Sequence, residues 1–101
     1  MWTGTLELDF LLGDVRSLKQ KRSVVRPLIA ELRRRFDVAV AEVDHHDLHR
    51  RAGIGVSVVA GDRGRVVEVL EAVERWAAGR PEVELLSVRP RCFSSEDLDE
   101  M

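Results

Sequence analysis

The chain has 101 residues and a mass of 11.4 kDa, which predicts a single domain. Apolar residues make up 45% of it and charged residues 34%, which is enough apolar side chain for a core and too much for a disordered segment. A single cysteine, Cys92, excludes an internal disulfide and any iron–sulfur or zinc site made of cysteines alone. No apolar run approaches the roughly 20 residues of a membrane helix, and the first residues lack a signal-peptide pattern. We therefore expect a soluble, cytoplasmic protein with no membrane partner.

The N-terminal third predicts a strand followed by a helix. Residues 2–12 alternate between apolar and polar side chains, as in a half-buried strand whose inward positions are Leu6, Leu8, Phe10 and Leu12. From Leu18 to Phe36 the apolar positions instead share one side of a helix, with Ser17 as its N-cap.

Pro27 leaves two descriptions of this helix open. It kinks one continuous helix, or Leu18 to Arg22 form a separate turn and Ser23 caps the main helix.

The remaining elements predict two strands, a second helix and a last strand. Strands are expected at 38–44 and 52–60, and Asp62 is the expected N-cap of the helix that follows. One face of that helix is apolar, and Gly79 and Pro81 end it. The residues of that face are Val66, Val69, Leu70, Val73, Trp76 and Ala77. A fourth strand at 82–93 contains Pro90, which favours an edge position.

The element order is therefore β-α-β-β-α-β. Two strand–helix–strand crossovers of the usual hand give an α+β, ferredoxin-like sandwich, with a four-stranded antiparallel sheet and both helices on one face. The first and third strands are central in that arrangement. We expect one domain over residues 1–93 and a frayed acidic C-terminal tail over residues 94–101.

Cations concentrate in the first helix. Between Arg16 and Phe36 there are eight cations and one anion, Glu31. Cations near a helix N-terminus oppose the macrodipole, so an anion bound there would explain them. The candidate RNA- or anion-binding residues are Lys19, Lys21, Arg22, Arg26 and Arg33. The competing interpretation is a solvated face whose arginine stems cover apolar surface.

Base stacking on the sheet is not the expected mode of RNA binding, because the outward positions of the central strands carry no aromatic side chain. The expected partner is structured RNA or a ribosomal particle.

Two further polar clusters have weaker functional interpretations. Glu42 and Asp44 are expected on one face of the second strand, as a candidate polar site. No nucleophile, oxyanion donor or phosphate-binding loop accompanies them, so we expect no catalytic residues and no enzyme. His45, His46 and His49 lie in a predicted hairpin loop with Asp47, where polar residues are ordinary, so we expect no metal and no cofactor.

The strings Ser17-Leu18-Lys19-Gln20-Lys21-Arg22 and Ala41-Glu42-Val43-Asp44, with Asp47-Leu48 after them, resemble the YlxP-like family of small bacterial proteins of unknown function. The resemblance extends over roughly residues 3–93 and implies a ferredoxin-like fold. Family genes often lie beside genes for transcription termination, translation initiation and ribosome-binding factors, which implies a role around RNA or the ribosome. The resemblance carries over no catalytic residues. The recurrent positions it implies are Leu18, Lys19, Lys21, Arg22, Phe36, Val40, Glu42 and Asp44.

Three functional interpretations follow. The first is a non-enzymatic accessory protein that contacts structured RNA or a ribosomal particle through the first helix, with the acidic tail competing for the same cations. The second is a homo-oligomeric interaction module, expected because one sheet face and the sheet edges are bare. The third is a regulatory domain that binds a small anion at the helix start near Ser17.

Overall fold

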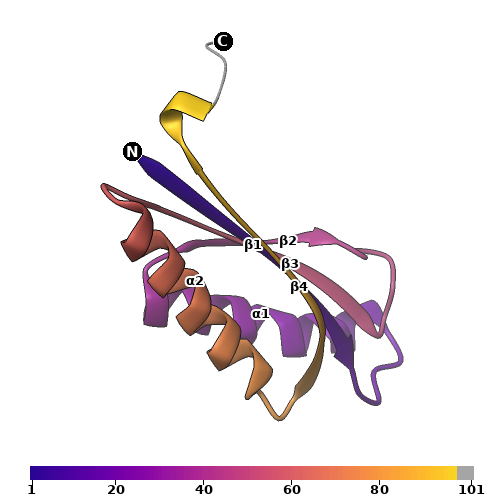
Figure 1. The fold of residues 1–101 in the computed structure, drawn as a ribbon. Helices are drawn as coiled ribbons and strands as arrows, with labels where there is room; N and C mark the ends of the chain where they lie inside the picture. Colours follow the sequence, from indigo (N-terminus) through magenta and orange to yellow (C-terminus); the bar gives the residue numbers. More distant parts are fainter. Residues whose placement is uncertain (98–101) are drawn as a thin grey trace.

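The computed structural model describes residues 1–97, and its element order is the predicted one (Figure 1). Every strand and helix boundary lies within one residue of its predicted position. The elements are β1 (Trp2–Leu12), α1 (Leu18–Phe36), β2 (Ala39–Asp44), β3 (Arg51–Ala60), α2 (Arg63–Ala78) and β4 (Val83–Ser94), followed by a 3-10 turn, Ser95–Asp97. No helix in residues 1–97 is both long and apolar enough to cross a membrane.

The sheet confirms the ferredoxin-like arrangement. Its four strands are all antiparallel and run in the order β2-β3-β1-β4, so β1 and β3 are central and Pro90 lies on an edge strand. Both helices cover the same face of the sheet, and the other face is open (Figure 1). We call that other face the open face.

The core lies between the sheet and the helices. The four predicted inward side chains of β1, from Leu6 to Leu12, are each at most 1% exposed. All six residues of the predicted apolar face of α2 are buried against them. Asp62 caps this helix, since its Oδ1 accepts from the Arg65 amide at 2.8 Å.

Helix α1 is continuous from Leu18 to Phe36 with Pro27 inside it. Ser17 is the N-cap, because its Oγ accepts from the Gln20 amide at 3.1 Å. The Ser23 hydroxyl donates to the Gln20 carbonyl at 2.6 Å from within the helix, so the alternative in which Ser23 caps a separate main helix is wrong. The helix ends at Asp37, whose left-handed backbone (φ 52°) turns the chain toward β2.

A β-bulge corrects one prediction about β2. Glu42 lies opposite Ile54, but Asp44 lies opposite the next residue of β3, Gly53, so Val43 is an extra residue. Because side chains alternate along a strand, the extra residue turns Asp44 to the open face while Glu42 faces α1. The prediction that Glu42 and Asp44 share a face is therefore wrong.

The start of the predicted C-terminal tail is ordered rather than frayed. Ser94 ends β4, and the Ser95 amide donates to the Met1 carbonyl at 2.9 Å. Ser95–Asp97 then form a 3-10 turn in which Asp97 Oδ2 accepts from the Ser94 amide at 2.8 Å. The rest of the predicted tail, residues 98–101, lies outside the described residues.

Candidate nucleic-acid interface

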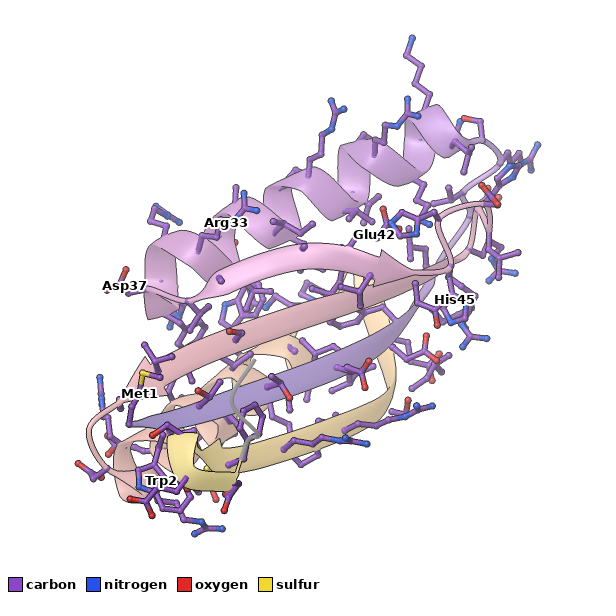
Figure 2. All side chains as sticks on the ribbon, turned by 90° about the horizontal axis from the view of Figure 1, so that it is seen from above. Met1, Trp2, Arg33, Asp37, Glu42 and His45 are labelled. Carbon is purple, nitrogen blue, oxygen red and sulfur yellow. The ribbon has the colours of Figure 1, made fainter. Side chains whose placement is uncertain are left out.

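Helix α1 lies along the β2 side of the sheet, and its outer surface faces away from the protein. In Figure 2, which looks onto the open face, α1 extends beyond β2 and its long side chains project outward. The apolar stripe of the helix is buried, namely Val25, Leu28 and Leu32. Cations on the opposite side of α1 therefore point toward the solvent.

Three of the five predicted binding residues form one exposed row. Lys19, Arg22 and Arg26 are all exposed and lie within one narrow arc of the helix, at a spacing of three and four residues. They span about 10 Å along the helix axis. None of them forms an ion pair with an acidic side chain of residues 1–97. We call these three residues the cationic row.

Lys21 has a different place from the one predicted for it. Its side chain is 3% exposed, and its Nζ lies 2.8 Å from Glu42 Oε2 and donates to the His45 carbonyl at 2.7 Å. Its ammonium therefore joins α1 to β2 and to the loop after it. We place Lys21 outside the exposed interface for that reason.

Arg33 also makes a contact within the folded chain. Its Nη2 donates to the backbone carbonyl of Val40 at 2.5 Å, across the gap between α1 and the edge strand β2. Figure 2 shows Arg33 on the helix beside the start of that strand. Its guanidinium extends the cationic row only in part, because one of its N–H donors is occupied by the Val40 carbonyl.

The cationic row borders a groove between α1 and the loop after β2. Arg22 and Arg26 stand at this groove with His46 and Asp47, and its volume is about 380 Å³. Its remaining lining consists of Leu18, Lys21, Val25, Ile29 and Glu42. The helix therefore offers cations on its outer surface and a partly apolar recess beside them.

The helix start itself offers less to an anion than its sequence suggests. Ser17 already accepts from the Gln20 amide, and the Gln20 side-chain oxygen accepts from the Arg16 amide at 2.6 Å. With Lys21 turned inward, Lys19 and Arg22 remain as exposed cations in the first turns of the helix. The geometry thus favours the outer surface of α1 over its N-terminus.

The histidines of the predicted loop point in different directions. His45 has a left-handed backbone (φ 61°), and its Nε2 lies 3.6 Å from Asp9 Oδ1 and 3.5 Å from Arg51 Nη2. His46 instead places Nε2 3.2 Å from the Glu42 carbonyl oxygen. No three His, Cys, Asp or Glu side chains within residues 1–97 are arranged to hold a metal ion. Cys92 is half-buried and packs against the core.

Sequence reasoning missed the ion pair between Asp9 and Arg51 that accompanies His45. The two residues come from β1 and β3, and Leu11 is the direct cross-strand partner of Arg51. Asp9 is therefore a diagonal neighbour, which becomes visible only when the register of the two strands is known.

Comparison with known proteins gives a family without an assigned activity. Residues 3–90 match the family described as "Protein of unknown function (DUF503)". The chain is similar to "Uncharacterized protein YlxP" of Bacillus subtilis (strain 168), with 27% identity over 90 residues that cover 89% of this chain and 98% of the relative. The chain accordingly belongs to the DUF503 family of proteins of unknown function, in which YlxP-like proteins are found.

Proposed function

We propose that this protein is a non-enzymatic accessory factor that binds structured RNA, free or within a ribosomal particle, through the cationic row of α1. The observation that carries the proposal is the row itself: Lys19, Arg22 and Arg26 are exposed, adjacent and unpaired with any acid of residues 1–97. In the free protein these three cations repel one another, and no acidic side chain of residues 1–97 neutralises them. The phosphates of a bound RNA would neutralise them.

The arrangement suits backbone contacts rather than base readout. A row of about 10 Å on one convex helix face can follow successive phosphates, which position a protein without reading sequence. The open face of the sheet also argues against base readout, because its central strands present Thr5, Glu7 and Gly55 and no aromatic side chains on which bases could stack.

The test is binding to a structured RNA hairpin and to small ribosomal subunits across a salt series. Three phosphate contacts correspond to a slope of log K against log salt of about −2 to −3. Binding that does not change with salt, or no binding at low salt, would contradict the proposal. Salt-insensitive binding to the subunits alone would indicate a protein surface on the particle instead.

Paired charge reversals locate the interface. Arg22→Glu with Arg26→Glu should abolish most of the binding and reduce the slope by about 1.5 to 2. The matched control is Arg63→Glu with Arg75→Glu, two exposed arginines of α2, which changes the net charge equally. If both double variants weaken binding by the same factor, net charge rather than α1 governs the interaction. Lys21 is left unchanged because its substitution would disturb the fold.

A further inference from the structure

The groove between α1 and the loop after β2, which we call the α1 groove, has a graded wall on its helix side. An apolar strip lies between the buried Lys21 and the exposed cations Arg22 and Arg26. The strip consists of Leu18, Val25 and Ile29. At about 100° per residue, these three side chains fall within an arc of about 40°, directly beside the arc of the two arginines. The helix therefore offers apolar surface with cations along its outer margin.

The opposite wall of the α1 groove is polar. Glu42 lies on β2 beside α1 (Figure 2), and His46 and Asp47 follow in the loop. The contact between His46 Nε2 and the Glu42 carbonyl oxygen, at 3.2 Å, holds the imidazole at this wall. The groove is thus apolar on one side and polar on the other, which suits a flat ligand with apolar faces and a polar edge.

The two carboxylates of the polar wall have acceptor capacity left. Asp47 is exposed and forms no ion pair with a cation of residues 1–97. Glu42 contacts Lys21 through Oε2, but its side chain remains 24% exposed and lines the groove. A carboxylate offers about four lone-pair sites, so a single ammonium contact does not saturate it. N–H donors of a ligand would therefore find acceptors along this wall.

Size and charge narrow the class of ligand. The groove has a volume of about 380 Å³, which is near the low end for small-molecule sites and suits one ring system. Three cations and two carboxylates line it, so it carries one net positive charge, and it opens beside the cationic row. A nucleotide combines the matching features: a flat base, N–H donors on the edge of that base, and an attached phosphate.

We propose that the α1 groove receives the base of one unpaired nucleotide of the bound RNA, while Arg22 and Arg26 bind the phosphates that flank it. This inference rests on the proposed function and adds to it, because the cationic row follows the backbone whereas the groove takes a single base. The base packs against the apolar strip, and its Watson–Crick edge donates to Glu42 and Asp47. Unstacked bases are commonly bound in this way, through apolar or guanidinium contacts and hydrogen bonds to their edges.

The carboxylates select among the bases. Guanine presents two adjacent donors on its Watson–Crick edge, the N1–H and the N2 amino group, which match the acceptors of a carboxylate. Uracil presents one N–H between two carbonyl oxygens, and those oxygens would face the carboxylates of Glu42 and Asp47. We therefore expect guanine to be the preferred base and uracil the least favoured.

The experiment compares three hairpins with the same stem: one fully paired, one with a bulged guanosine and one with a bulged uridine. The guanosine bulge should bind the full chain at least about 10-fold more tightly than the paired stem, and the uridine bulge at most about 3-fold more tightly. Equal affinities for all three would overturn this inference and leave the proposed function intact. An equal gain for both bulges would overturn the role of the carboxylates. No binding to any hairpin would contradict the proposed function and this inference with it.

A variant that fills the groove separates it from the cationic row. Ile29→Trp should remove the gain from the bulged guanosine and change the affinity for the paired stem by less than about 2-fold. The matched control is Val67→Trp, since Val67 is also half-buried and lines a groove of about 380 Å³ between α2 and β4. Thermal unfolding shows whether both variants remain folded. Loss of the gain in both variants, or in neither, would overturn the inference.

Asp47→Ala tests the polar wall without changing the packing of α1, because Asp47 is exposed in the loop. It should lower the affinity for the guanosine bulge and leave that for the uridine bulge unchanged. An unchanged preference for guanosine would contradict the role assigned to Asp47.

Free nucleotides share this chemistry with RNA, and competition distinguishes the two sources. Guanosine monophosphate at about 1 mM should not displace the bulged hairpin, because one phosphate cannot occupy the whole cationic row. Displacement by guanosine monophosphate at micromolar concentration would make a free nucleotide the ligand of the groove and overturn the assignment to RNA.

Discussion

The Nζ of Lys21 lies 2.8 Å from Glu42 Oε2 and 2.7 Å from the carbonyl oxygen of His45, in a side chain that is 3% exposed. Glu42 Oε2 is itself buried and has no partner of hydrogen-bond geometry, so the contact with Lys21 acts as a close ion pair. One ammonium therefore connects three separate pieces of the chain: α1, β2 and the loop that leads to β3.

We expect removal of either charge to destabilise the fold. Lys21→Ala should lower the free energy of unfolding by about 3 kcal/mol, the low end for breaking a buried pair, because the Glu42 side chain is 24% exposed. Glu42→Ala should cost at least as much, since it leaves the more deeply buried ammonium unpaired. Urea unfolding measures both effects.

The exposed neighbour Lys19 is the control, and Lys19→Ala should change stability by less than about 0.5 kcal/mol. The double change Lys21→Met with Glu42→Leu should recover much of the loss, because it replaces two charges with apolar groups of similar size. Equal losses for Lys19→Ala and Lys21→Ala would show that the pair contributes nothing to stability.

The buried position of Lys21 could have been predicted from the sequence. It lies three residues after Leu18 and four before Val25, on the apolar stripe of α1 rather than on the cationic one. A cation at such a position requires a buried partner. The identity of that partner required the packing of α1 on β2, which periodicity alone does not provide.

Periodicity was sufficient for the fold but not for the register. The alternation in β1 and the helical spacing in α2 each report which side of an element is buried, so the predicted core is the observed one. The bulge at Val43 adds one residue to β2 without breaking its apolar pattern. Its effect on Asp44 is therefore invisible until β2 and β3 are aligned.

Gly53 is required by this bulge. A Cβ at Gly53 would lie 2.7 Å from the Cβ of Asp44 and 3.2 Å from its Cα, so backbone would have to move. We expect Gly53→Ala to destabilise the protein by about 1–3 kcal/mol, the usual cost of forcing extra atoms into a packed site. Gly13→Ala is the control, because no atom lies within 4 Å of the added Cβ. Denaturation midpoints that are equal for the two variants would contradict this account.

The two helix caps should contribute separately. Ser17→Ala and Asp62→Ala each remove a side-chain acceptor from an N-terminal amide, at 3.1 Å and 2.8 Å, and each should cost about 1 kcal/mol. Because the caps belong to different helices and share no partner, the double variant should show the sum within about 0.5 kcal/mol. A strongly non-additive result in thermal unfolding would mean that the two helix starts are coupled.

Arg33 and His46 should protect the edge of β2. Their contacts with the carbonyls of Val40 and Glu42 occupy two acceptors that another strand would use. Arg33→Ala with His46→Ala should therefore cost about 1–3 kcal/mol in stability, at roughly 0.5–1.5 kcal/mol for each contact. It should also make aggregation depend steeply on concentration.

Light scattering during slow heating measures this tendency. Arg34→Ala with His49→Ala is the matched control, because Arg34 forms only a 3.9 Å contact with Glu31 and His49 is exposed in the loop. Both double variants remove the same types of side chain, so a difference between them isolates the two edge contacts. Identical aggregation would show that the free amide hydrogens of the edge, or another surface, control association instead.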